Sequence, residues 1–485
     1  MSTLAQALAR ASPRLSPPPT PVRAMLIHGA VFALWILLFA RAFVPDNVFA
    51  WSAGIVYVSY DTILLAFVFW QTLPLRRRPA TASPASHVSL GVIVAAHNEA
   101  SILPVTLAAL AAQTDAPDEI LIADDGSTDG TIALLARDYG LAPPEIGDIS
   151  PPSPVLPALR WLRLPHGGKA AALNTALARI GTETVLTVDA DTLLDPHGIA
   201  AMRDAFSADP ALVAATGVLI PVCGPSVSGR VMQWFQTYEY IRNFLSRYAW
   251  GRLNGLLLIS GAFAGFRRQA VLDVGGFDQA CLVEDYELIH RLRRHGVLHG
   301  LNWRTTVLGG ARARTDAPAT VSAFLRQRRR WFGGFLQTQY WYRDMVGNRR
   351  YGWLGGAMLP VKAIDTLQPL YGLLGVGLLL FYLVTGRVSI LAPVAGVIAA
   401  KIAIDLAFHL WSLHLYRRWV GAGTGSGVTS AILAALIEPF SFQILRHLGA
   451  AGGWVMLLTG ERSWGTQRRQ SLAADPSTAI LNWRP

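Results

Sequence analysis

The sequence is poor in cysteine and in charged residues, and each deficit excludes a class of protein. Only two cysteines, Cys223 and Cys281, occur among 485 residues, which excludes a disulfide framework and a CxxC metal knuckle. Asp, Glu, Lys and Arg make up only 15% of the chain, below the roughly 25% of an ordinary soluble domain. Hydrophobic residues make up 52%, and the mean hydropathy is +0.35. This composition favours a protein with membrane spans.

Long apolar stretches near the start of the chain are the first candidate spans. Residues 25–44 and 51–73 are each about long enough to cross a bilayer at ~1.5 Å per residue. Three arginines at 76–78 follow, and by the positive-inside rule they place the next segment in the cytoplasm. We therefore predict two transmembrane helices within 25–78, after a polar, proline-rich, flexible tail at 1–24. Two buried core helices are the alternative.

The character of the sequence changes at about residue 87, where apolar runs shorten and charges reappear. We predict a water-soluble domain over 87–317, an amphipathic interfacial helix over 318–350, a C-terminal membrane region over 353–460 and a basic tail over 461–485. Charges interrupt the last apolar stretch, so this region holds two or three spans and the chain holds four or five. The net charge of +11 suits cytoplasmic loops, so nucleic acid is not an expected partner.

Short apolar strands alternate with helix patterns in the predicted soluble domain. This alternation predicts a parallel α/β sheet. Polar residues follow three of the predicted strands, at 95–99, 124–127 and 189–191. Ligands of such sheets bind at the carboxyl ends of the strands, so the three loops indicate one binding site.

The segment VLTVDADT ends a predicted strand with two carboxylates, Asp189 and Asp191. Such a pair offers hard oxygen ligands to Mg²⁺ or Mn²⁺ and leaves coordination positions for substrate phosphates. Upstream, Lys169 follows two glycines at a helix start, where a positive charge is disfavoured unless an anion lies nearby. Together these residues favour a nucleoside diphosphate as the ligand. The metal would neutralise the negative charge that develops on the diphosphate as it leaves. The alternatives are turn and cap roles for the aspartates and a solvent-exposed lysine.

Two further segments carry candidate residues. In LVEDYELIHRLRRHG, Glu284 or Asp285 acts either as a helix cap or as a general base for a sugar hydroxyl. Ser260 and Gly261 are small enough to let a bulky acceptor approach. In FLRQRRRWFGGFLQTQYW, the interleaving of basic and apolar residues favours a helix in the membrane interface, although Arg330 would also suit a diphosphate.

The order of these motifs resembles that of the membrane-integrated family 2 glycosyltransferases, which include cellulose, chitin, hyaluronan and poly-N-acetylglucosamine synthases. The matching motifs, over about residues 90–335, are AAHNE, DDGSTDGT, GGKAAALN, DADT, SGAFAGFRR, VEDYEL and QRRRW. The resemblance implies a GT-A, Rossmann-like α/β catalytic domain in the cytoplasm, between N- and C-terminal transmembrane helices. It also implies an inverting transfer from a UDP-sugar.

The resemblance also implies roles for individual residues. Contact with the nucleoside is implied for Glu99, Asp124 and Asp125, contact with the diphosphate for Lys169 and Asp189, metal binding for Asp191 and catalytic base function for Asp285. The residues expected around the acceptor and the diphosphate are Ser260, Gly261, Glu284, Gln327, Arg330 and Trp331.

We therefore expect a polysaccharide synthase of the bacterial inner membrane, with or without extrusion of its product. The expected ligands are a UDP-sugar, Mg²⁺ or Mn²⁺, a glycan or lipid acceptor, the lipid bilayer and envelope partner proteins. The alternatives are a single-addition enzyme acting on a membrane lipid and a catalytically silent scaffold or receptor. Ionisable residues in the apolar stretches are candidates for a polar route through the membrane, and they are Lys362, Asp365, Lys401, Asp405, His409 and Glu438. The donor sugar, the linkage and the oligomeric state do not follow from the sequence.

Overall fold

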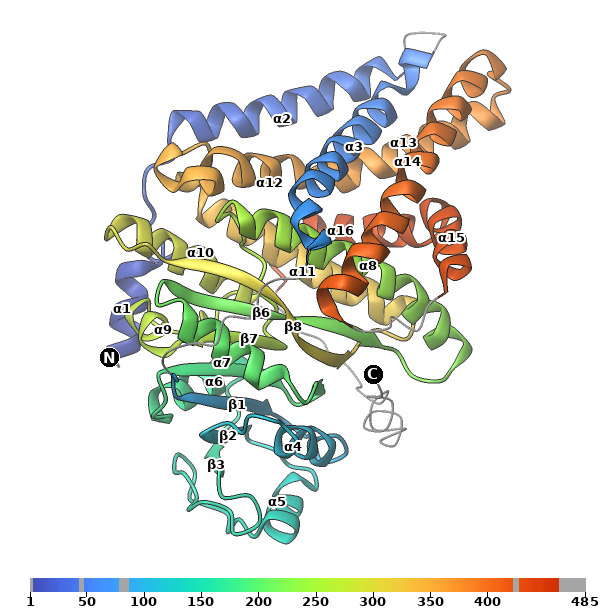
Figure 1. Ribbon diagram of the computed structural model, residues 1–485. Coiled ribbons are helices and arrows are strands. Elements are labelled where there is room, and N and C mark those ends of the chain that lie inside the picture. The colour runs from blue at the N-terminus through green and yellow to red at the C-terminus, as the bar shows by residue number, and fades with distance from the viewer. Residues whose placement is uncertain (1–2, 43–47, 78–86, 422–426, 462–485) are drawn as a thin grey trace.

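The computed structural model describes residues 3–42, 48–77, 87–421 and 427–461. Its centre is an eight-stranded sheet in the order β3-β2-β1-β4-β7-β6-β8-β5, with helices packed against it (Figure 1). The strands are β1 (Leu90–Ala96), β2 (Glu119–Asp125), β3 (Leu159–Leu164), β4 (Thr184–Asp189), β5 (Thr192–Leu194), β6 (Leu212–Val222), β7 (Phe263–Arg267) and β8 (Arg304–Asp316). This is the mixed α/β, Rossmann-like fold of the GT-A type.

Strand direction divides the sheet into two halves. β3, β2, β1 and β4 are parallel, as the alternation of strands and helices predicted. β7 is antiparallel to both β4 and β6, and β5 is antiparallel to β8, whereas β6 and β8 are parallel. The expectation of a parallel sheet is therefore wrong for β7 and β5. The apolar run before Ser260 resembles a strand in composition, but β7 begins only at Phe263. Hydrophobic periodicity predicts a buried segment without fixing its direction or its partner.

The parallel strands are built from residues that suit a sheet covered on both faces. β1 has the sequence LGVIVAA and β4 has TVLTVD, and nearly all of these residues are buried. Near-continuous runs of Val, Leu and Ile are typical of buried parallel strands. Phe263 and Phe266 on β7 are also buried, so these two aromatic rings belong to the core. Polar residues appear where the strands end, and the loops at these ends therefore lie along one edge.

The helices of the α/β domain connect and cover the strands. α6 begins at Lys169, directly after Gly168, whose φ of +88° favours glycine. α10 carries Glu284 and Asp285 in its first turn, where negative charge is favourable to the helix dipole. The helices of this domain are α4 (Leu103–Ala111), α5 (Thr131–Tyr139), α6 (Lys169–Arg179), α7 (Gly198–Ala208), α8 (Val227–Arg252), α9 (Arg268–Asp273), α10 (Glu284–Leu298) and α11 (Val321–Trp341).

Apolar helices precede and follow the α/β domain and lie in the upper half of Figure 1. Three segments of the described chain are long and apolar enough to cross a membrane, and two bent helix pairs would bring the number to five. The bends measure 40° and 47°. The helices are α2 (Val22–Arg41), α3 (Ser52–Thr72), α12 (Leu359–Asp365), α13 (Gln368–Val384), α14 (Val388–Val420), α15 (Val428–Ile437) and α16 (Phe442–Thr459). The basic tail predicted for 461–485 lies outside the described residues, apart from Glu461.

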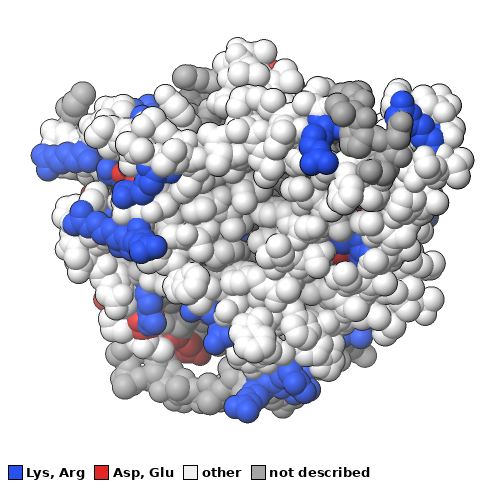
Figure 2. Space-filling model, turned by 90° about the horizontal axis from the view of Figure 1, so that it is seen from above, with Lys and Arg blue, Asp and Glu red and all other residues white. Residues whose placement is uncertain are grey.

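Several charged side chains in and beside these apolar helices form ion pairs. Lys401 Nζ lies 2.6 Å from Asp61 Oδ2 and also contacts Asp405. Arg242 on α8 contacts Glu438, which lies at the bend between α15 and α16. Figure 2 shows that the face seen from above carries few Lys, Arg, Asp or Glu side chains over its centre. Pairing and sparse charge both suit an apolar medium, where an unpaired charge is costly.

The start of the chain differs from the flexible tail predicted for residues 1–24. Thr3–Ala11 forms helix α1, which packs against α9 on the side of the α/β domain (Figure 1). Leu4, Leu8 and Ala11 are spaced so that they share one side of this helix. The prolines of the segment all follow residue 12, so they interrupt the chain only after the helix has ended.

His290 on α10 makes the stability of the fold sensitive to acid. Its side chain is fully buried, Nδ1 lies 2.9 Å from the Tyr286 carbonyl oxygen, and burial lowers its pKa from 6.5 to about 4. Between these two pH values the unfolded chain binds a proton that the folded protein does not bind. Stability therefore falls as the pH drops through this window, by about 3 kcal/mol in total.

We expect His290→Gln, which cannot take up this proton, to lose less thermal stability than the wild type between pH 7 and pH 4.5. The measurement is the unfolding temperature in detergent across this pH range. His299→Gln removes an exposed histidine at the end of the same helix and should keep the pH dependence of the wild type. Equal acid sensitivity in the wild type and His290→Gln would contradict the prediction.

Candidate active site

The end of β2 carries two of the residues predicted to contact a nucleoside. Asp124 Oδ1 accepts a hydrogen bond from the Ser127 amide at 2.9 Å. Asp125 Oδ1 accepts hydrogen bonds from the amides of Gly167 and Gly168 at 2.7 and 3.1 Å. Asp125 thus holds the glycine turn from which α6 starts.

Glu99 lies in the loop that follows β1, and its side chain is largely buried. Its main-chain oxygen accepts hydrogen bonds from the amides of Ile102 and Leu103, at the start of α4. β1 is paired with β2 on one side and with β4 on the other. The Glu99 loop therefore lies between the loop of Asp124 and the loop of Asp189.

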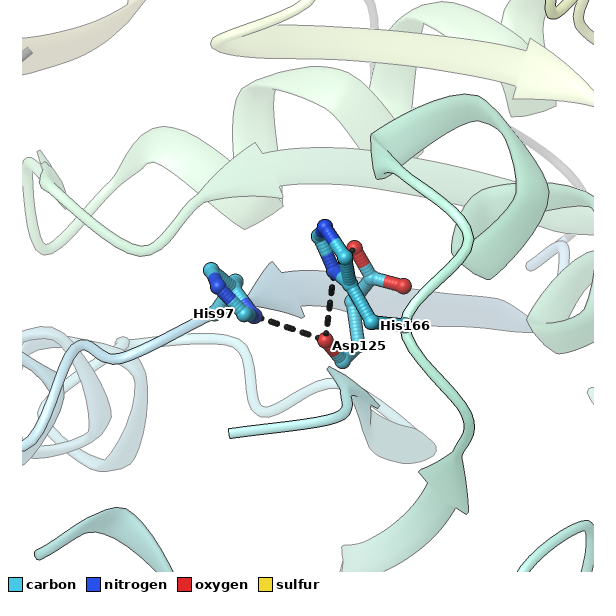
Figure 3. Close-up of side chains that lie close together, drawn as sticks. All are labelled: His97, Asp125 and His166. Atoms are coloured by element: carbon cyan, nitrogen blue, oxygen red, sulfur yellow. Dashed lines mark hydrogen bonds and ion pairs between the residues drawn. The ribbon is translucent and has the colours of Figure 1, made fainter. Parts of the chain in front are cut away.

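Two histidines that the sequence analysis did not select flank Asp125 (Figure 3). His97 Nδ1 lies 2.7 Å and His166 Nδ1 3.1 Å from the Asp125 carbonyl oxygen, and the two rings stack with centroids 4.3 Å apart. Ligand atoms of the three residues lie within 4.8 Å of one another, close enough to hold a metal ion. A ring nitrogen that donates to a carbonyl carries the proton, so each histidine would coordinate only through Nε2 while these hydrogen bonds last.

Lys169 connects carboxylates from two different elements. Its Nζ lies 2.5 Å from Asp189 Oδ1 at the end of β4 and 3.7 Å from Glu284 Oε1 at the start of α10. Burial would lower the pKa of Lys169, but the charges of Asp189 and Glu284 outweigh it and raise this pKa. Burial and, to a smaller extent, the charge of Asp285 raise the pKa of Glu284. The positive charges of Lys169 and Arg330 only partly offset this rise. Lys169 is therefore a permanent cation among carboxylates.

Asp285 is held in a fixed orientation at the start of α10. Its Oδ2 accepts a hydrogen bond from the Gly261 amide at 2.7 Å, and its Oδ1 accepts one from the Tyr286 amide at 2.8 Å. A Cβ atom at Gly261 would lie 3.1 Å from Asp285 Oδ2, so a side chain there would displace the carboxylate. The Gly261 main-chain oxygen accepts a hydrogen bond from the Thr187 hydroxyl on β4 at 3.3 Å. The adjacent Ser260 amide donates to the Thr216 hydroxyl.

Asp191 lies buried in the turn between β4 and β5. Its main-chain oxygen accepts a hydrogen bond from the Asp316 amide at the end of β8, at 3.2 Å. The hydroxyl of Thr106 on α4 donates to the Ala190 oxygen at 2.5 Å. The turn that separates Asp189 from Asp191 is therefore anchored from two sides.

Helix α11 brings the QRRRW motif to the loop that precedes α10. Arg330 donates to the Leu282 main-chain oxygen at 3.1 Å. Gln327 Oε1 is buried without a hydrogen-bond partner among the described residues. The Arg328 guanidinium lies 4.6 Å from the ring centroid of Trp331, and Trp331 packs against the main core.

The predicted residues thus form a linked group at one edge of the sheet. Asp189, Lys169, Glu284 and Asp285 are joined by the contacts described above, and Gly261 and Arg330 join this group through Asp285 and through the loop before α10. Asp125 connects to it through the glycine turn, whereas Asp124, Glu99, Asp191 and Ser260 lie at the neighbouring strand end and loops. Such a group can attract phosphate through its lysine and arginine and can accept a proton at Asp285.

Two family models match the chain over these same elements. The model described as glycosyl transferase family 2 matches residues 91–275, and the model described as glycosyl transferase family group 2 matches residues 184–422. Together they include the sheet, α10 and α11.

Curated relatives include poly-beta-1,6-N-acetyl-D-glucosamine synthases of staphylococci. The one from Staphylococcus aureus (strain COL) is 30% identical over 246 residues, which are 50% of this chain and 53% of the relative. The one from Staphylococcus epidermidis is 25% identical over 294 residues, which are 59% of this chain and 61% of the relative. The matched region thus spans little more than half the length of these relatives.

A solved structure shares the fold. It is the mannosyltransferase PcManGT from Pyrobaculum calidifontis in complex with GDP-Man and Mn²⁺, with a TM-score of 0.53 and 20% sequence identity. The similarity covers 81% of this chain and 99% of the other chain. At this level of identity the similarity establishes the GT-A architecture and nothing about the donor.

Proposed function

Because this chain belongs to the family 2 glycosyltransferases, we propose that it transfers a sugar from a UDP-sugar to a growing polysaccharide, with inversion at the anomeric carbon. The transfer uses Mg²⁺ or Mn²⁺ and takes place at the cytoplasmic face of the bacterial inner membrane. The acceptor is the end of a glycan, and the product passes to the envelope. The names of the curated relatives support polymer synthesis over the addition of one sugar to a lipid.

The observation that carries this proposal is the position of Lys169 between Asp189 and Glu284, at 2.5 and 3.7 Å. Lys169 and the nearby Arg330 offer positive charge to a diphosphate, and the arginine fork suits phosphate oxygens. The surrounding carboxylates would repel the same diphosphate. A divalent cation held by Asp189 and Asp191 would offset this repulsion.

The residues present fit such a cation. Asp189 and Asp191 supply hard oxygen ligands of the kind that Mg²⁺ and Mn²⁺ prefer. His97, Asp125 and His166 supply two imidazoles and one carboxylate, a set less suited to Mg²⁺. We therefore assign the metal of the reaction to Asp191 and not to the histidine cluster. When bound, the metal would neutralise the negative charge on the departing diphosphate.

Asp285 acts as the general base in this proposal. Its two oxygens are oriented by the Gly261 and Tyr286 amides, so the carboxylate needs no reorganisation to accept a proton. The acceptor hydroxyl loses its proton to Asp285 and forms a bond to the anomeric carbon while the bond to UDP breaks on the opposite face. One displacement of this kind inverts the configuration. The buried Gln327 Oε1 provides an acceptor for a hydrogen bond from the incoming glycan.

A donor panel tests the proposal. Purified protein in detergent is incubated with Mg²⁺ or Mn²⁺ and with UDP-glucose, UDP-N-acetylglucosamine, UDP-galactose or UDP-glucuronate, and UDP release and labelled products are measured. We expect one donor to be consumed and a long chain of uniform linkage to form. If the products are glycolipids that carry one added sugar, the enzyme is a single-addition glycosyltransferase and not a polymer synthase. Failure to consume any donor with either metal would favour a silent scaffold.

A further inference from the structure

A segment at the start of the chain contacts both elements that lead into the candidate active site. This N-terminal strap, residues 3–20, consists of α1 and the stretch that joins it to the apolar helix α2. It lies beside α9 and α10 in Figure 1. None of its residues belongs to the motifs from which the site was predicted.

The strap packs directly on the loop formed by residues 275–283, which leads into Glu284 and Asp285. Gly275 has a φ of +90°, and a Cβ atom there would lie 2.2 Å from the Leu8 amide nitrogen. No side chain fits at this position, so the backbones of α1 and the 275–283 loop are in contact. The loop begins against the strap and ends at the proposed base.

A buried ion pair joins the strap to the same loop. Arg14 Nε and one terminal nitrogen donate to Asp278 Oδ2 and Oδ1 at 2.7 and 2.9 Å. The Asp278 side chain is only 2% exposed, and Asp278 Oδ1 also accepts from the Ala280 amide at 3.0 Å. A two-point contact of this kind fixes direction as well as distance. Arg14 therefore restrains the loop seven residues before Asp285.

The strap also contacts the end of α11, the helix that carries Gln327 and Arg330. The Arg14 guanidinium lies 5.7 Å from the ring centroid of Trp341, the last residue of α11. Thr20 Oγ1 accepts a hydrogen bond from Arg343 at 2.6 Å, just beyond α11. The strap thus bridges the loop before the base and the helix above it.

A third contact relates the 275–283 loop to Lys169. The Asn174 side chain on α6 donates to the Phe277 oxygen at 2.8 Å and accepts from the Phe277 amide at 2.7 Å. α6 begins with Lys169. The loop is therefore clamped between α6 on one side and the strap on the other, and its far end carries the carboxylates that surround Lys169.

We propose that the strap positions Asp285 for sugar transfer, with Arg14 and Asp278 as positioning residues that act through the 275–283 loop. This inference rests on the proposed function, since it assigns the strap to the same reaction. Release of the strap leaves the hydrogen bonds of Asp125 to the glycine turn and the Lys169–Asp189 pair in place and lets the base drift. The expected effect falls on kcat and not on KM for the donor.

The test compares four proteins: wild type, Arg14→Gln, Arg14→Gln/Asp278→Asn, and Arg10→Gln as the matched control. Arg10 is exposed at the end of α1, so its replacement removes the same charge without touching the loop. We expect Arg14→Gln to lower kcat about tenfold, because small displacements of a catalytic group are costly, and to leave the donor KM within about twofold. Arg10→Gln should behave as wild type.

The double variant separates positioning from simple destabilisation. Arg14→Gln leaves a buried, unpaired carboxylate, and Asp278→Asn removes that charge while keeping an oxygen for the Ala280 amide. Positioning predicts that kcat stays low in the double variant. Recovery of wild-type kcat in the double variant, or an unchanged kcat in Arg14→Gln, would overturn the inference.

Hydrogen–deuterium exchange of residues 275–283 gives a readout that needs no substrate. We expect faster exchange in Arg14→Gln and wild-type exchange in Arg10→Gln. If no donor is consumed by the wild type, the proposed function fails, and the exchange data still decide whether the strap holds the loop. If the wild type is active and Arg14→Gln changes neither kcat nor exchange, the strap inference fails alone.

Discussion

Asp285→Asn is expected to lower sugar transfer about a thousandfold, because a positioned general base contributes roughly 10²- to 10⁴-fold to such reactions. Asn keeps one oxygen to accept the hydrogen bond of the Gly261 amide, which Asp285 accepts at 2.7 Å. The hydrogen bond from the Tyr286 amide is lost, the one from Gly261 is kept, and the side chain can no longer take up a proton. The measurement is kcat from UDP release, with UDP binding measured in parallel.

Two results would distinguish base loss from misfolding. UDP affinity in Asp285→Asn should stay close to that of the wild type, because Lys169 and Asp125 are unchanged. Asp273→Asn, at an exposed position on α9, should retain full activity. Transfer within about threefold of the wild type in Asp285→Asn would show that another group takes the proton.

Asp191→Asn is expected to lower transfer by a similar factor, for a different reason. Removing one carboxylate ligand weakens the hold on the metal, and loss of about 4 kcal/mol of charge stabilisation corresponds to about a thousandfold in rate. Asp191 is buried in an anchored turn. The measurement is transfer as a function of Mn²⁺ concentration.

The metal dependence identifies the cause. We expect the Mn²⁺ concentration for half-maximal activity to rise in Asp191→Asn and to stay unchanged in Asp204→Asn, an exposed control on α7. His97→Gln, which alters the histidine cluster, should also leave this concentration unchanged. If the Mn²⁺ concentration for half-maximal activity changes in His97→Gln and not in Asp191→Asn, the metal of the reaction binds at the histidine cluster instead.

The sequence predicted the part of the fold in which local pattern and chain direction agree. β1, β2 and β4 are apolar runs that end in polar loops, and each pairing among β1, β2, β3 and β4 is parallel as expected. Strand β7 starts later than its apolar flank suggests. The run LLLI before Ser260 is as apolar as a strand, but β7 begins only at Phe263, and Ala262 just before it accepts a main-chain hydrogen bond from Asp189 of β4 at 3.3 Å.

The sequence names the candidate site residues, whose roles stay predictions, but it could not predict their mutual distances. Lys169 and Glu284 are far apart in the chain, and their contact depends on how α10 is placed against α6. The histidine pair was missed for a related reason. Gly126 adopts a φ of +66°, and a Cβ atom there would lie 2.7 Å from the His166 amide nitrogen, so the stacking on His97 depends on a close backbone approach.

Helix α11 has a packing feature that periodicity did not predict. The interleaved arginines and aromatics favoured a helix lying in the membrane interface, and that position stays a prediction. The helix also contains Gly333 and Gly334 on a closely packed side. A Cβ atom at Gly334 would lie 2.4 Å from a Val283 side-chain carbon. The two glycines let α11 approach the loop before α10, which places Arg330 against Leu282.

The affinity for UDP with and without Mn²⁺, measured by titration calorimetry on the purified full chain, tests the central claim most directly. That claim is that a divalent cation joins a nucleotide diphosphate to the aspartates at the end of β4. We predict that UDP binds at least about tenfold more tightly with Mn²⁺ and that Asp191→Asn removes this difference. Equal affinity with and without the metal, or a difference that survives in Asp191→Asn, would contradict the account.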